Sequence, residues 1–401
     1  MDLKYSHAYE CFREEVEAFV KTFWQPDPKA PKADRRAADS TFRARAVEAG
    51  YLYRSVPRAY GGSEQVADVL KAQIIRDEFA KARAPSELPG GGVAMLVPTL
   101  LEHGTEAQKQ RFIRPTLAGE YLWAQGYSEP NAGSDLVSLK TRGELTGDHW
   151  VINGQKIWST LAQYAHYMFV LARTEPNSDS KHAGISYLLV DLKQPGVTIR
   201  PLKQITGGAE FCEVFFDNVT TPADWIVGER GAGWAVSKST LSHERSALGG
   251  ASTSVGLFDK LVELARRRHI NGQPALKDPA MRQRLAVLKG SVDAHLYSSY
   301  RQLSMSAHGQ DPGVVGLMNK LVSTQIGHEV SKIARDLIGS DFLLAPPIEG
   351  SVQGKGAGDE KWINQFMGSL GMAIAGGTSN IQRNVIAERG YGLPREDAAR
   401  S

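Results

Sequence analysis

The spacing of apolar residues changes twice along this chain and divides it into three segments. Up to about residue 120, apolar residues recur every three or four positions, as on one face of a helix. From Tyr121 they alternate with polar residues between turn dipeptides, as in strands, and after Gly231-Ala-Gly233 the helical spacing returns. The chain is therefore predicted to be an α+β multidomain protein, with a helical domain at 1–120, an antiparallel β-domain at 121–231 and a helical domain at 232–401.

Helix signals in the first segment are regularly placed. Helical spacing covers 9–24, 40–50, 65–82 and 93–103. Thr105 and Gln108 have the spacing of a capping box, in which each side chain serves the other residue's backbone N–H. A further helix is therefore predicted to begin at Glu106 and to carry Phe112 into the core.

The second segment is rich in β-branched and aromatic residues between turns. Strands are predicted at 121–127, 139–145, 150–152, 156–159, 167–173, 184–192, 198–201 and 213–217. Thr146-Gly147-Asp148 and Asn153-Gly154 are typical of tight hairpins, because Gly and Asn tolerate a positive φ. The strands are expected to form an antiparallel meander without a Rossmann crossover. The helices of the third segment are expected to break at 271–279, 308–313 and 343–359.

Bulk chemistry excludes several classes of protein. The 47 Lys and Arg residues against 44 Asp and Glu leave a net charge of +3, too balanced for an obligate nucleic-acid binder. No apolar run reaches the ~18 residues of a membrane span, and the first residues contain no apolar h-region, so no secretory signal is expected. Cys11 and Cys212 belong to no Cys/His cluster, so neither a metal site nor a disulfide is expected, and a cytoplasmic location is predicted.

Glu244 is the first candidate for chemistry. Trp234, Leu241 and Leu248 are seven residues apart and predict the buried face of a helix, and the spacing of Glu244 puts its carboxylate on that face. Two interpretations stay open. The carboxylate reaches solvent or pairs with a basic residue, or it lies in a desolvated pocket, where a raised pKa suits a general base.

Three further stretches combine glycine with short polar side chains. The loop at 127–135 offers free backbone N–H groups, and the hydroxyls of Ser128 and Ser134 could hydrogen-bond a ligand. The same composition also suits a plain turn. The strand at 154–160 ends in Trp158 and two hydroxyls, which suits either a planar ring ligand or a core tryptophan. The stretch at 375–383 presents a glycine-rich helix start, which suits either an anionic ligand or an ordinary N-cap.

In this order on an α-β-α chain, these stretches resemble the acyl-CoA dehydrogenase family. The resemblance covers about 12–394. Its carriers are Ser-Glu-Pro-Asn-Ala-Gly-Ser-Asp at 128–135, Asn-Gly-Gln-Lys-Ile-Trp-Ser-Thr at 153–160, Gly-Gly-Thr-Ser-Asn-Ile-Gln-Arg at 376–383, and the helix start Gly-Thr-Glu-Ala-Gln-Lys at 104–109. The resemblance implies an N-terminal helical domain, a central β-domain and a C-terminal four-helix bundle, with FAD between the last two.

The resemblance also implies a reaction and a set of site residues. Family members oxidise an acyl-CoA to the 2,3-enoyl-CoA, with a carboxylate removing the α-proton and flavin N5 accepting the β-hydride. The positions that match cofactor-binding residues are Gln125, Tyr127, Ser128, Gly133, Ser134, Trp158, Ser159, Thr160, Thr378 and Asn380. Ser134 would also meet the thioester end of the substrate.

The chain departs from the family pattern at the position of the catalytic base. Many members carry the catalytic glutamate directly before Gly-Thr, where this chain has Gly376. A second family arrangement has the glutamate on the first long helix of the C-terminal domain, directly before an arginine, and Glu244-Arg245 matches it. The resemblance therefore favours Glu244 as the base and implies that Arg245 modulates it or lies near the substrate, unless Arg245 only forms a salt bridge.

A second departure concerns oligomers. In the family, an Arg before Phe-Gly and a later Gln with Gly-Gly-x-Gly reach the FAD of a neighbouring subunit, and neither 266–274 nor 336–341 keeps the motif here. The chain is expected to be a homo-oligomer (dimer or tetramer) or a heterotetramer with a related chain, and to pass electrons to an electron-transfer flavoprotein. A flavin oxidase and a non-catalytic subunit are the alternatives.

Overall fold

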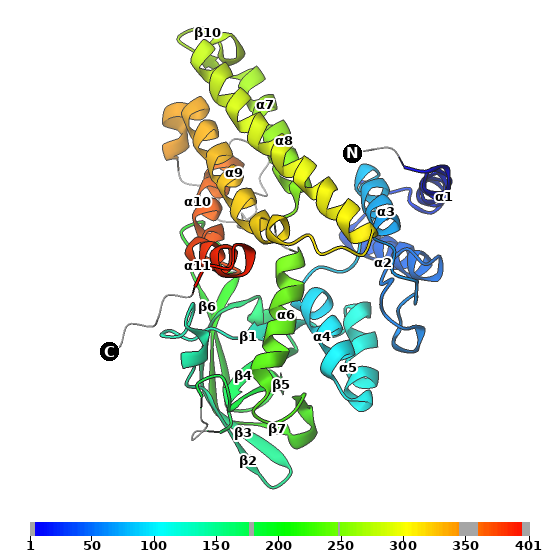
Figure 1. The fold of residues 1–401 in the computed structure, drawn as a ribbon, viewed down its shortest axis with the longest axis vertical. Helices are drawn as coiled ribbons and strands as arrows, with labels where there is room; N and C mark the ends of the chain where they lie inside the picture. The colour runs from blue at the N-terminus through cyan, green and yellow to red at the C-terminus, as the bar shows by residue number, and fades with distance from the viewer. Residues whose placement is uncertain (1–4, 176–179, 248, 345–359, 395–401) are drawn as a thin grey trace.

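The computed structural model describes residues 5–175, 180–247, 249–344 and 360–394, without the side chains of residues 245–247 and 360. Figure 1 shows a β-domain at the bottom, long helices above it and the N-terminal helices beside both. The predicted succession of a helical, a β and a second helical domain is confirmed. The domain boundaries at 120 and 231 stay predictions.

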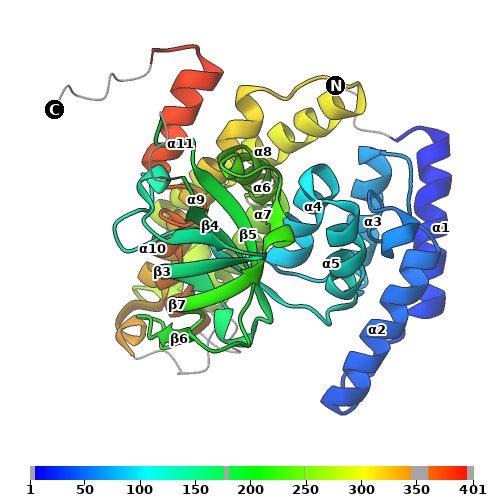
Figure 2. The same ribbon diagram turned by 90° about the horizontal axis from the view of Figure 1, so that it is seen from below.

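The N-terminal segment folds into helices at the predicted places. They are α1 His7–Phe23, α2 Lys32–Glu48, α3 Val69–Lys81, a π-helical turn η2 Gly92–Leu96 that continues as α4 Val97–His103, and α5 Glu106–Ala118. Helix α2 begins earlier than predicted, directly after Pro31, because a proline that precedes a helix removes no intrahelical hydrogen bond. Figure 2 shows α4 and α5 between the sheet and the outer helices α1, α2 and α3.

The capping box at the start of α5 is confirmed. The Thr105 hydroxyl accepts a hydrogen bond from Gln108 N at 3.3 Å, and Gln108 Oε1 accepts one from Thr105 N at 3.1 Å. Phe112 is fully buried, as predicted. The Gln108 amide also donates to the carbonyl oxygens of Asp224 at 2.6 Å and Ile226 at 2.7 Å. One side chain therefore caps the helix and fastens it to the β-domain.

The central segment forms one curved sheet. Its strands are β1 Trp123–Gly126, β2 Arg142–Thr146, β3 His149–Thr160, β4 Tyr167–Arg173, β5 Ile185–Asp191, β6 Val197–Leu202, β7 Phe211–Pro222 and β8 Ile226–Val227. They pair in the order β6-β7-β3-β2-β4-β5-β8, with β1 beside β4. Strand β4 is buried on both faces: Phe169 and Leu171 join the core shared with the N-terminal helices, whereas Met168 and Val170 join a second core with β3 and β7. A continuous apolar run is what such a strand requires.

Two predictions for the sheet are corrected. It is not a purely antiparallel meander, because β1 pairs with β4 in parallel, with Gln125 opposite Phe169. Asn153-Gly154 makes no hairpin turn either: β3 continues through it, and a register shift against β7 marks a β-bulge. Gly154 has a φ of 152°, and a Cβ there would lie 2.5 Å from Thr141 Oγ1. Glycine is needed here for the close approach of two strands. The turn at Gly147, with a φ of 61°, is confirmed.

The C-terminal segment is again helical. Its elements are α6 Gly233–Ala247, α7 Ala251–Arg267, a short hairpin of β9 His269–Ile270 and β10 Gln273–Pro274, α8 Pro279–Ala307, α9 Val314–Ile338, α10 Glu360–Met372, and α11 Ser379–Val385 with a π-helical extension Ile386–Gly390. An apolar core of Leu261, Leu288, Val330 and Trp362 joins α7, α8, α9 and α10 as a four-helix bundle. The breaks at 271–279 and 308–313 are confirmed, and most of 343–359 lies outside the described residues.

Helix α6 is separate from this bundle. It packs against β5, η2 and α4, and its Val236 belongs to the core of the N-terminal helices. Between α6 and α7 the chain turns at Gly249, which has a φ of 80°. A Cβ at Gly249 would lie 2.8 Å from Lys320 N, so the turn rests directly on the backbone of α9. No break is predicted here from the sequence, because the close contact is with a residue far along the chain.

Candidate functional site

A buried ion pair fixes the loop that follows β1. Glu129 Oε1 lies 2.8 Å from Lys156 Nζ on β3, and the Glu129 carboxylate also accepts from Lys140 N at 2.6 Å and Thr141 N at 2.9 Å. Lys156 has no solvent exposure and donates a second hydrogen bond to Tyr127 O at 3.1 Å. The loop at 127–135 is therefore held against β3 from inside the domain.

Burial shifts the pKa of Lys156 but not that of Glu129 in its own direction. Desolvation lowers the pKa of the Lys156 ammonium from 10.5 to about 8, although Glu129 opposes the shift. The pKa of Glu129 is lowered: burial acts to raise it, but Lys156 and the two backbone donors outweigh that effect. At neutral pH both groups are charged, so this is an ion pair inside the protein.

The fixed loop presents short polar residues outward. Ser128 is half-buried, whereas Gly133 and Ser134 are exposed. A Cβ built at Gly133 meets nothing within 4 Å, so the space above it is open. Ser128 O accepts a hydrogen bond from Ile157 N at 2.9 Å, which joins the loop to the strand that carries Trp158. The predicted ligand-facing residues of two motifs therefore lie side by side.

Trp158 does not belong to the core. Its side chain is 58% exposed, and its φ of 62° is in the left-handed region, which costs a bulky residue about 1–2 kcal/mol. The register of β3 against β7 shifts between Lys156 and Ser159, and this bulge turns the indole outward. Thr160 is exposed as well, whereas Ser159 is buried and its hydroxyl has no hydrogen-bond partner among the described residues. The core-tryptophan interpretation is wrong.

Glu244 lies on the inner face of α6, but different residues define that face. Val236, Ser237 and Thr240 are buried there, whereas Trp234 and Leu241 are only partly buried and the side chain of Leu248 lies outside the described residues. Glu244 follows Thr240 by one turn and is half-buried. The predicted stripe is therefore corrected: Glu244 is half-buried one turn beyond Val236, Ser237 and Thr240, and its role stays a prediction.

The charge of Glu244 acts on residues from two distant parts of the chain. Its carboxylate is close enough to Tyr127 to contribute to the raised pKa of that phenol, although burial is the largest cause. The Glu244 carboxylate also acts on Lys320 of α9. Burial lowers the pKa of the Lys320 ammonium below its usual value, and Glu244 partly opposes this shift. The side chain of Arg245, predicted to modulate Glu244 or contact substrate, lies outside the described residues.

Buried hydroxyls separate α6 from the sheet. Thr240 Oγ1 lies 2.9 Å from Thr99 Oγ1 of α4, and the hydroxyls of Tyr127 and Tyr187 are buried beside them. Neither phenol makes a hydrogen bond of good geometry among the described residues, and burial raises the pKa of both. The phenols therefore stay neutral at neutral pH.

Lys320 of α9 holds the glycine motif before α11. Its side chain is buried, and Nζ donates to Gly377 O at 2.6 Å. Sequence reasoning missed Lys320, although Lys320, Thr324, Gly327 and Ser331 follow helical spacing on the buried face of α9. The available sequence signal was a lysine at the end of a helical stripe of small residues, which indicates that the lysine side chain faces the core.

The glycine motif forms a turn with its own cap. Gly376 and Gly377 have φ values of 61° and 89°, and the N-cap of α11 is Thr378, whose hydroxyl accepts from Ile381 N at 3.2 Å. The ordinary N-cap considered for this stretch is therefore present, at Thr378. Asn380 is exposed, and its Oδ1 accepts from Arg383 at 3.2 Å. Both residues predicted to contact the cofactor, Thr378 and Asn380, follow directly on the carbonyl that Lys320 holds.

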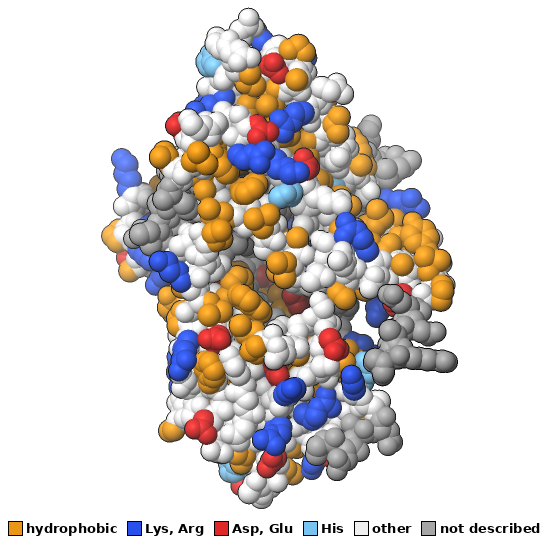
Figure 3. Space-filling view, turned by 90° about the vertical axis from the view of Figure 1, so that its left-hand side faces the viewer, with side chains coloured by type: hydrophobic (Ala, Val, Ile, Leu, Met, Phe, Trp, Pro, Cys, Tyr) orange, Lys and Arg blue, Asp and Glu red, His pale blue; other side chains and the backbone are white. Residues whose placement is uncertain are grey.

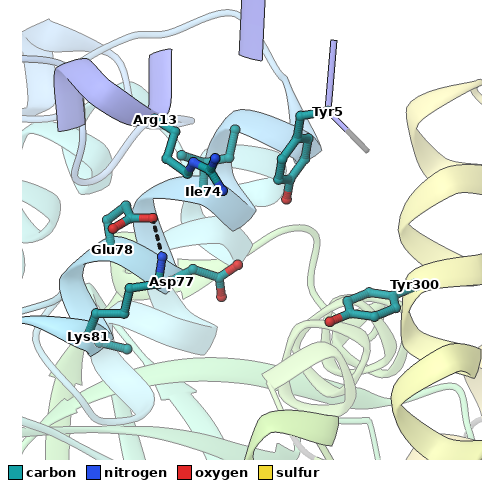
Figure 4. Close-up of a pocket in the computed structure, with 8 residues that line it drawn as sticks. Tyr5, Arg13, Ile74, Asp77, Glu78, Lys81 and Tyr300 are labelled. Atoms are coloured by element: carbon teal, nitrogen blue, oxygen red, sulfur yellow. Dashed lines mark hydrogen bonds and ion pairs between the residues drawn. The ribbon is translucent and has the colours of Figure 1, made fainter. Parts of the chain in front are cut away.

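These contacts bring the four sequence stretches into one region. Figure 3 shows the face where the bundle meets the β-domain below it: a hollow opens between them, lined by hydrophobic side chains, with acidic atoms in its depth. The cavity in Figure 4 is different. It has a volume of about 310 Å³, lies between α1, α3 and α8, and is lined by none of the predicted site residues. Burial raises the pKa of Asp77 there.

The two segments that depart from the family motif have structural roles. Residues 266–274 form the end of α7 and the β9–β10 hairpin at the tip of the bundle. Asp336 on α9 pairs with Arg284 of α8 at 2.9 Å and with Arg335 at 2.9 Å. These contacts join helices within one chain.

The arrangement defines a class of protein: a helical domain, a β-domain and a helical bundle around a hollow that holds a carboxylate. Three family models match in succession, the N-terminal, middle and C-terminal domains of acyl-CoA dehydrogenase, at residues 6–120, 124–219 and 231–391. The chain belongs to the acyl-CoA dehydrogenase family and is an oxidoreductase of that class. Members of the family are FAD-dependent flavoproteins.

Several relatives match over most of their length. The chain is 40% identical to acyl-CoA dehydrogenase IpdE1 of Mycobacterium tuberculosis, over 90% of this chain and 89% of the relative. It is 42% identical to IpdE1 of Mycolicibacterium smegmatis, over 80% of each chain. Among solved structures, the ChsE4–ChsE5 complex of M. tuberculosis contains a chain with a TM-score of 0.76 and 28% identity, over 99% of this chain and 100% of that one. A chain of the Tcur3481–Tcur3483 steroid acyl-CoA dehydrogenase has a TM-score of 0.77 and 26% identity, over the same shares.

Among the described residues, every helix is too short or too polar to cross a lipid bilayer.

Proposed function

We propose that this chain catalyses the α,β-dehydrogenation of an acyl-CoA thioester, with Glu244 as the base that removes the α-proton. The observation that carries the proposal is the place of Glu244 on the inner face of α6, one turn after the buried Thr240, where its charge acts on Tyr127 and Lys320. The alternative family position is occupied by Gly376, which has no side chain to accept a proton. Among the four stretches brought together, Glu244 supplies the only carboxylate outside the Glu129–Lys156 pair and the exposed Asp135.

FAD fits the outward face of the β-domain. Trp158 offers an exposed flat ring held by strained backbone, Thr160 an exposed hydroxyl beside it, and Gly133 an unobstructed surface. The residues that would hold the cofactor are Gln125, Tyr127, Ser128, Gly133, Ser134, Trp158, Thr160, Thr378 and Asn380. Ser159 would contribute through its backbone, since its side chain is buried. When bound, FAD supplies the acceptor for the substrate hydride.

The chain's own residues would prepare the proton transfer. Neutral aromatic rings of Tyr127, Phe169 and Tyr187 pack below α6, with centroid distances of 5.8–6.3 Å. Such surroundings strengthen electrostatic interactions at the carboxylate and keep competing water away. Ser134, exposed on the fixed loop, would meet the thioester end of the substrate.

The test is a conservative change of the base. Glu244→Gln should retain FAD and lose anaerobic bleaching of the flavin by acyl-CoA, because an amide accepts no proton. Glu263→Gln, on the exposed side of α7, is the matched control and should bleach like the parent. A Glu244→Gln protein that still reduces its flavin at the parent rate would refute the assignment.

We further propose that the chain works in a heteromeric complex on ring-bearing acyl-CoA substrates. Two observations support this: 266–274 and 336–341 lack the motif that reaches a neighbour's FAD, and two similar structures are titled as two-component complexes, one of them a steroid enzyme. An electron-transfer flavoprotein would accept the electrons. The free cysteines Cys11 and Cys212 support action in the cytoplasm.

Native mass spectrometry tests the assembly. A chain that needs a partner should bind less than one FAD per chain when expressed alone and gain FAD on co-expression with a related chain. A stable homo-oligomer with one FAD per chain would overturn the heteromeric part. Titration with linear, branched and ring-bearing CoA thioesters, followed by flavin absorbance, then identifies the acyl group. A colourless protein that added FAD does not rescue would point to a non-catalytic subunit.

A further inference from the structure

One buried ammonium contacts the loop and belongs to the strand that would hold the cofactor. Lys156 of β3 donates from Nζ to Glu129 Oε1 at 2.8 Å and to Tyr127 O at 3.1 Å, and both acceptors belong to the loop at 127–135. Lys156 has no solvent exposure and Glu129 is 8% exposed, so these contacts lie inside the β-domain. Two residues further along β3, the Trp158 indole is on the surface of the same domain. Lys156 therefore connects the two segments from the inside.

The bulge that turns the indole outward depends on the same loop. Between Lys156 and Ser159 the strand β3 has two residues, Ile157 and Trp158, where its partner β7 has one. Ile157 N donates to Ser128 O at 2.9 Å, so the loop accepts this N–H of the bulge. The left-handed backbone of Trp158, with a φ of 62°, persists only where its surroundings fix it. The loop is therefore part of what fixes the indole.

Few hydrogen bonds hold the loop against β3. In the part of the chain that the structure describes, those bonds come from Lys156 Nζ and from Ile157 N. The two backbone hydrogen bonds between Glu129 and Ala132, each 3.0 Å long, lie within the loop and do not reach the strand. Without the ammonium, one hydrogen bond would remain between the loop and β3.

An ion pair is not the most stabilising way to fill this position. Both charges lose their hydration when they are buried, and a well-packed apolar pair of similar volume is often equally stable or more stable. The ion pair differs from an apolar contact in direction, because its hydrogen bonds fix Tyr127 O and the Glu129 carboxylate relative to Lys156 Nζ. This difference favours a role in geometry over a role in stability alone.

We propose that Lys156 and Glu129 are positioning residues for the cofactor: their ion pair holds the loop at 127–135 and the bulge at Trp158 in the FAD-binding arrangement before FAD binds. This inference rests on the proposed function, which makes FAD the ligand of this surface. A preformed site spends less binding free energy on ordering its own groups. The ion pair should therefore contribute to FAD affinity separately from its effect on the stability of the fold.

The test compares FAD affinity with stability. FAD is titrated into the flavin-free protein, as the single chain or, if that binds none, as the co-expressed complex, and its fluorescence gives the dissociation constant. Lys156→Met/Glu129→Gln leaves neither charge unpaired and should weaken binding about tenfold, the equivalent of one good hydrogen bond. Glu129→Gln alone keeps an acceptor for Lys156 Nζ and should weaken binding about threefold; it serves as the test if the double variant does not fold.

Val219→Ala is the matched control. Val219 is fully buried in the same domain and lies opposite Ile152, toward the other end of β3 from Trp158. Its truncation should lower the thermal midpoint, because it leaves a cavity in the core, and should leave the FAD dissociation constant unchanged. The double variant should show the reverse order of effects, with a larger loss of affinity for a given change in midpoint.

A second readout needs neither FAD nor activity. Amide hydrogen exchange of the flavin-free protein is followed in peptides that cover 127–135 and 156–160. Because Ile157 N donates to Ser128 O, it should be protected in the parent, and both peptides should exchange faster in the double variant. Peptides from β5 should exchange alike in the two proteins. Unaltered exchange in 127–135 would show that the ion pair does not hold the loop, and would overturn the inference.

The outcomes separate the two proposals. A parent that binds FAD in neither form refutes the proposed function and, with it, this inference. If the parent binds FAD and the double variant binds it equally tightly, the ion pair only stabilises the domain, and the inference alone is overturned. A loss of affinity in Val219→Ala equal to that in the double variant would overturn it too, because stability would then explain the effect.

Discussion

Replacing Lys156 by Met should destabilise the β-domain far more than a lysine-to-methionine change in a surface ion pair. The ammonium has no solvent exposure and lies 2.8 Å from Glu129 Oε1. Methionine fills a similar volume but has no N–H to donate, so Glu129, 8% exposed, keeps its charge with only the backbone donors of Lys140 and Thr141, whereas even a deprotonated Lys156 amine still donates to it. Breaking a buried pair from one side costs about 3–5 kcal/mol.

Chemical unfolding followed by circular dichroism measures this loss. The control is Lys21→Met, which breaks the exposed pair of Lys21 and Glu17 on α1 and should leave the midpoint unchanged. Lys156→Met/Glu129→Gln should be more stable than Lys156→Met alone, because no buried charge remains. Equal, small losses in Lys156→Met and Lys21→Met would refute the reasoning.

The same lysine predicts a pH dependence with a definite sign. Its pKa is about 8 in the folded protein and 10.5 ordinarily, so the folded state releases this proton first as pH rises. The unfolded chain then binds more protons between about pH 8 and 10.5, and the free energy of unfolding increases with pH across that window, by about 3 kcal/mol from this group. Lys156→Met should lack this increase, and an unchanged slope in the variant would contradict the assignment.

Two further predictions concern backbone conformation. Gly249→Ala should lower the thermal midpoint and slow flavin reduction, because alanine is strained at a φ of 80° and its Cβ would lie 2.8 Å from Lys320 N; Gly256→Ala, inside α7 with open space around it, is the control and should do neither. Trp158→Ala should weaken FAD binding in a fluorescence titration with little loss of stability, because the indole is 58% exposed. Trp158→Gly should be more stable than Trp158→Ala by about 1 kcal/mol, since glycine adopts a φ of 62° without strain; equal stability would argue against strain at this position.

Local signals in the sequence predicted the elements well. The capping box of Thr105 and Gln108 and the turn at Gly147 depend on residues within four positions of one another, so the sequence contains all that is needed. The inward direction of Glu244 was likewise predictable from helical spacing, and the ordered motifs identified the family.

Pairing between distant segments was not predictable in this way. The parallel pairing of β1 with β4, the outward turn of Trp158 at a bulge and the break at Gly249 all depend on which strand or helix lies opposite. Asn153-Gly154 illustrates the limit: the dipeptide suits a hairpin, but the close approach of Thr141, directly before β2, and the pairing with β7 make it a bulge inside one long strand.

Local spacing and the ordered short motifs were enough to predict the helical, β and helical succession, the family and the candidate base. The partners of two buried lysines, Glu129 for Lys156 and Gly377 O for Lys320, follow instead from the folded structure. A buried charge needs a partner, and whichever element the fold places beside it supplies that partner, here 27 and 57 residues away along the chain.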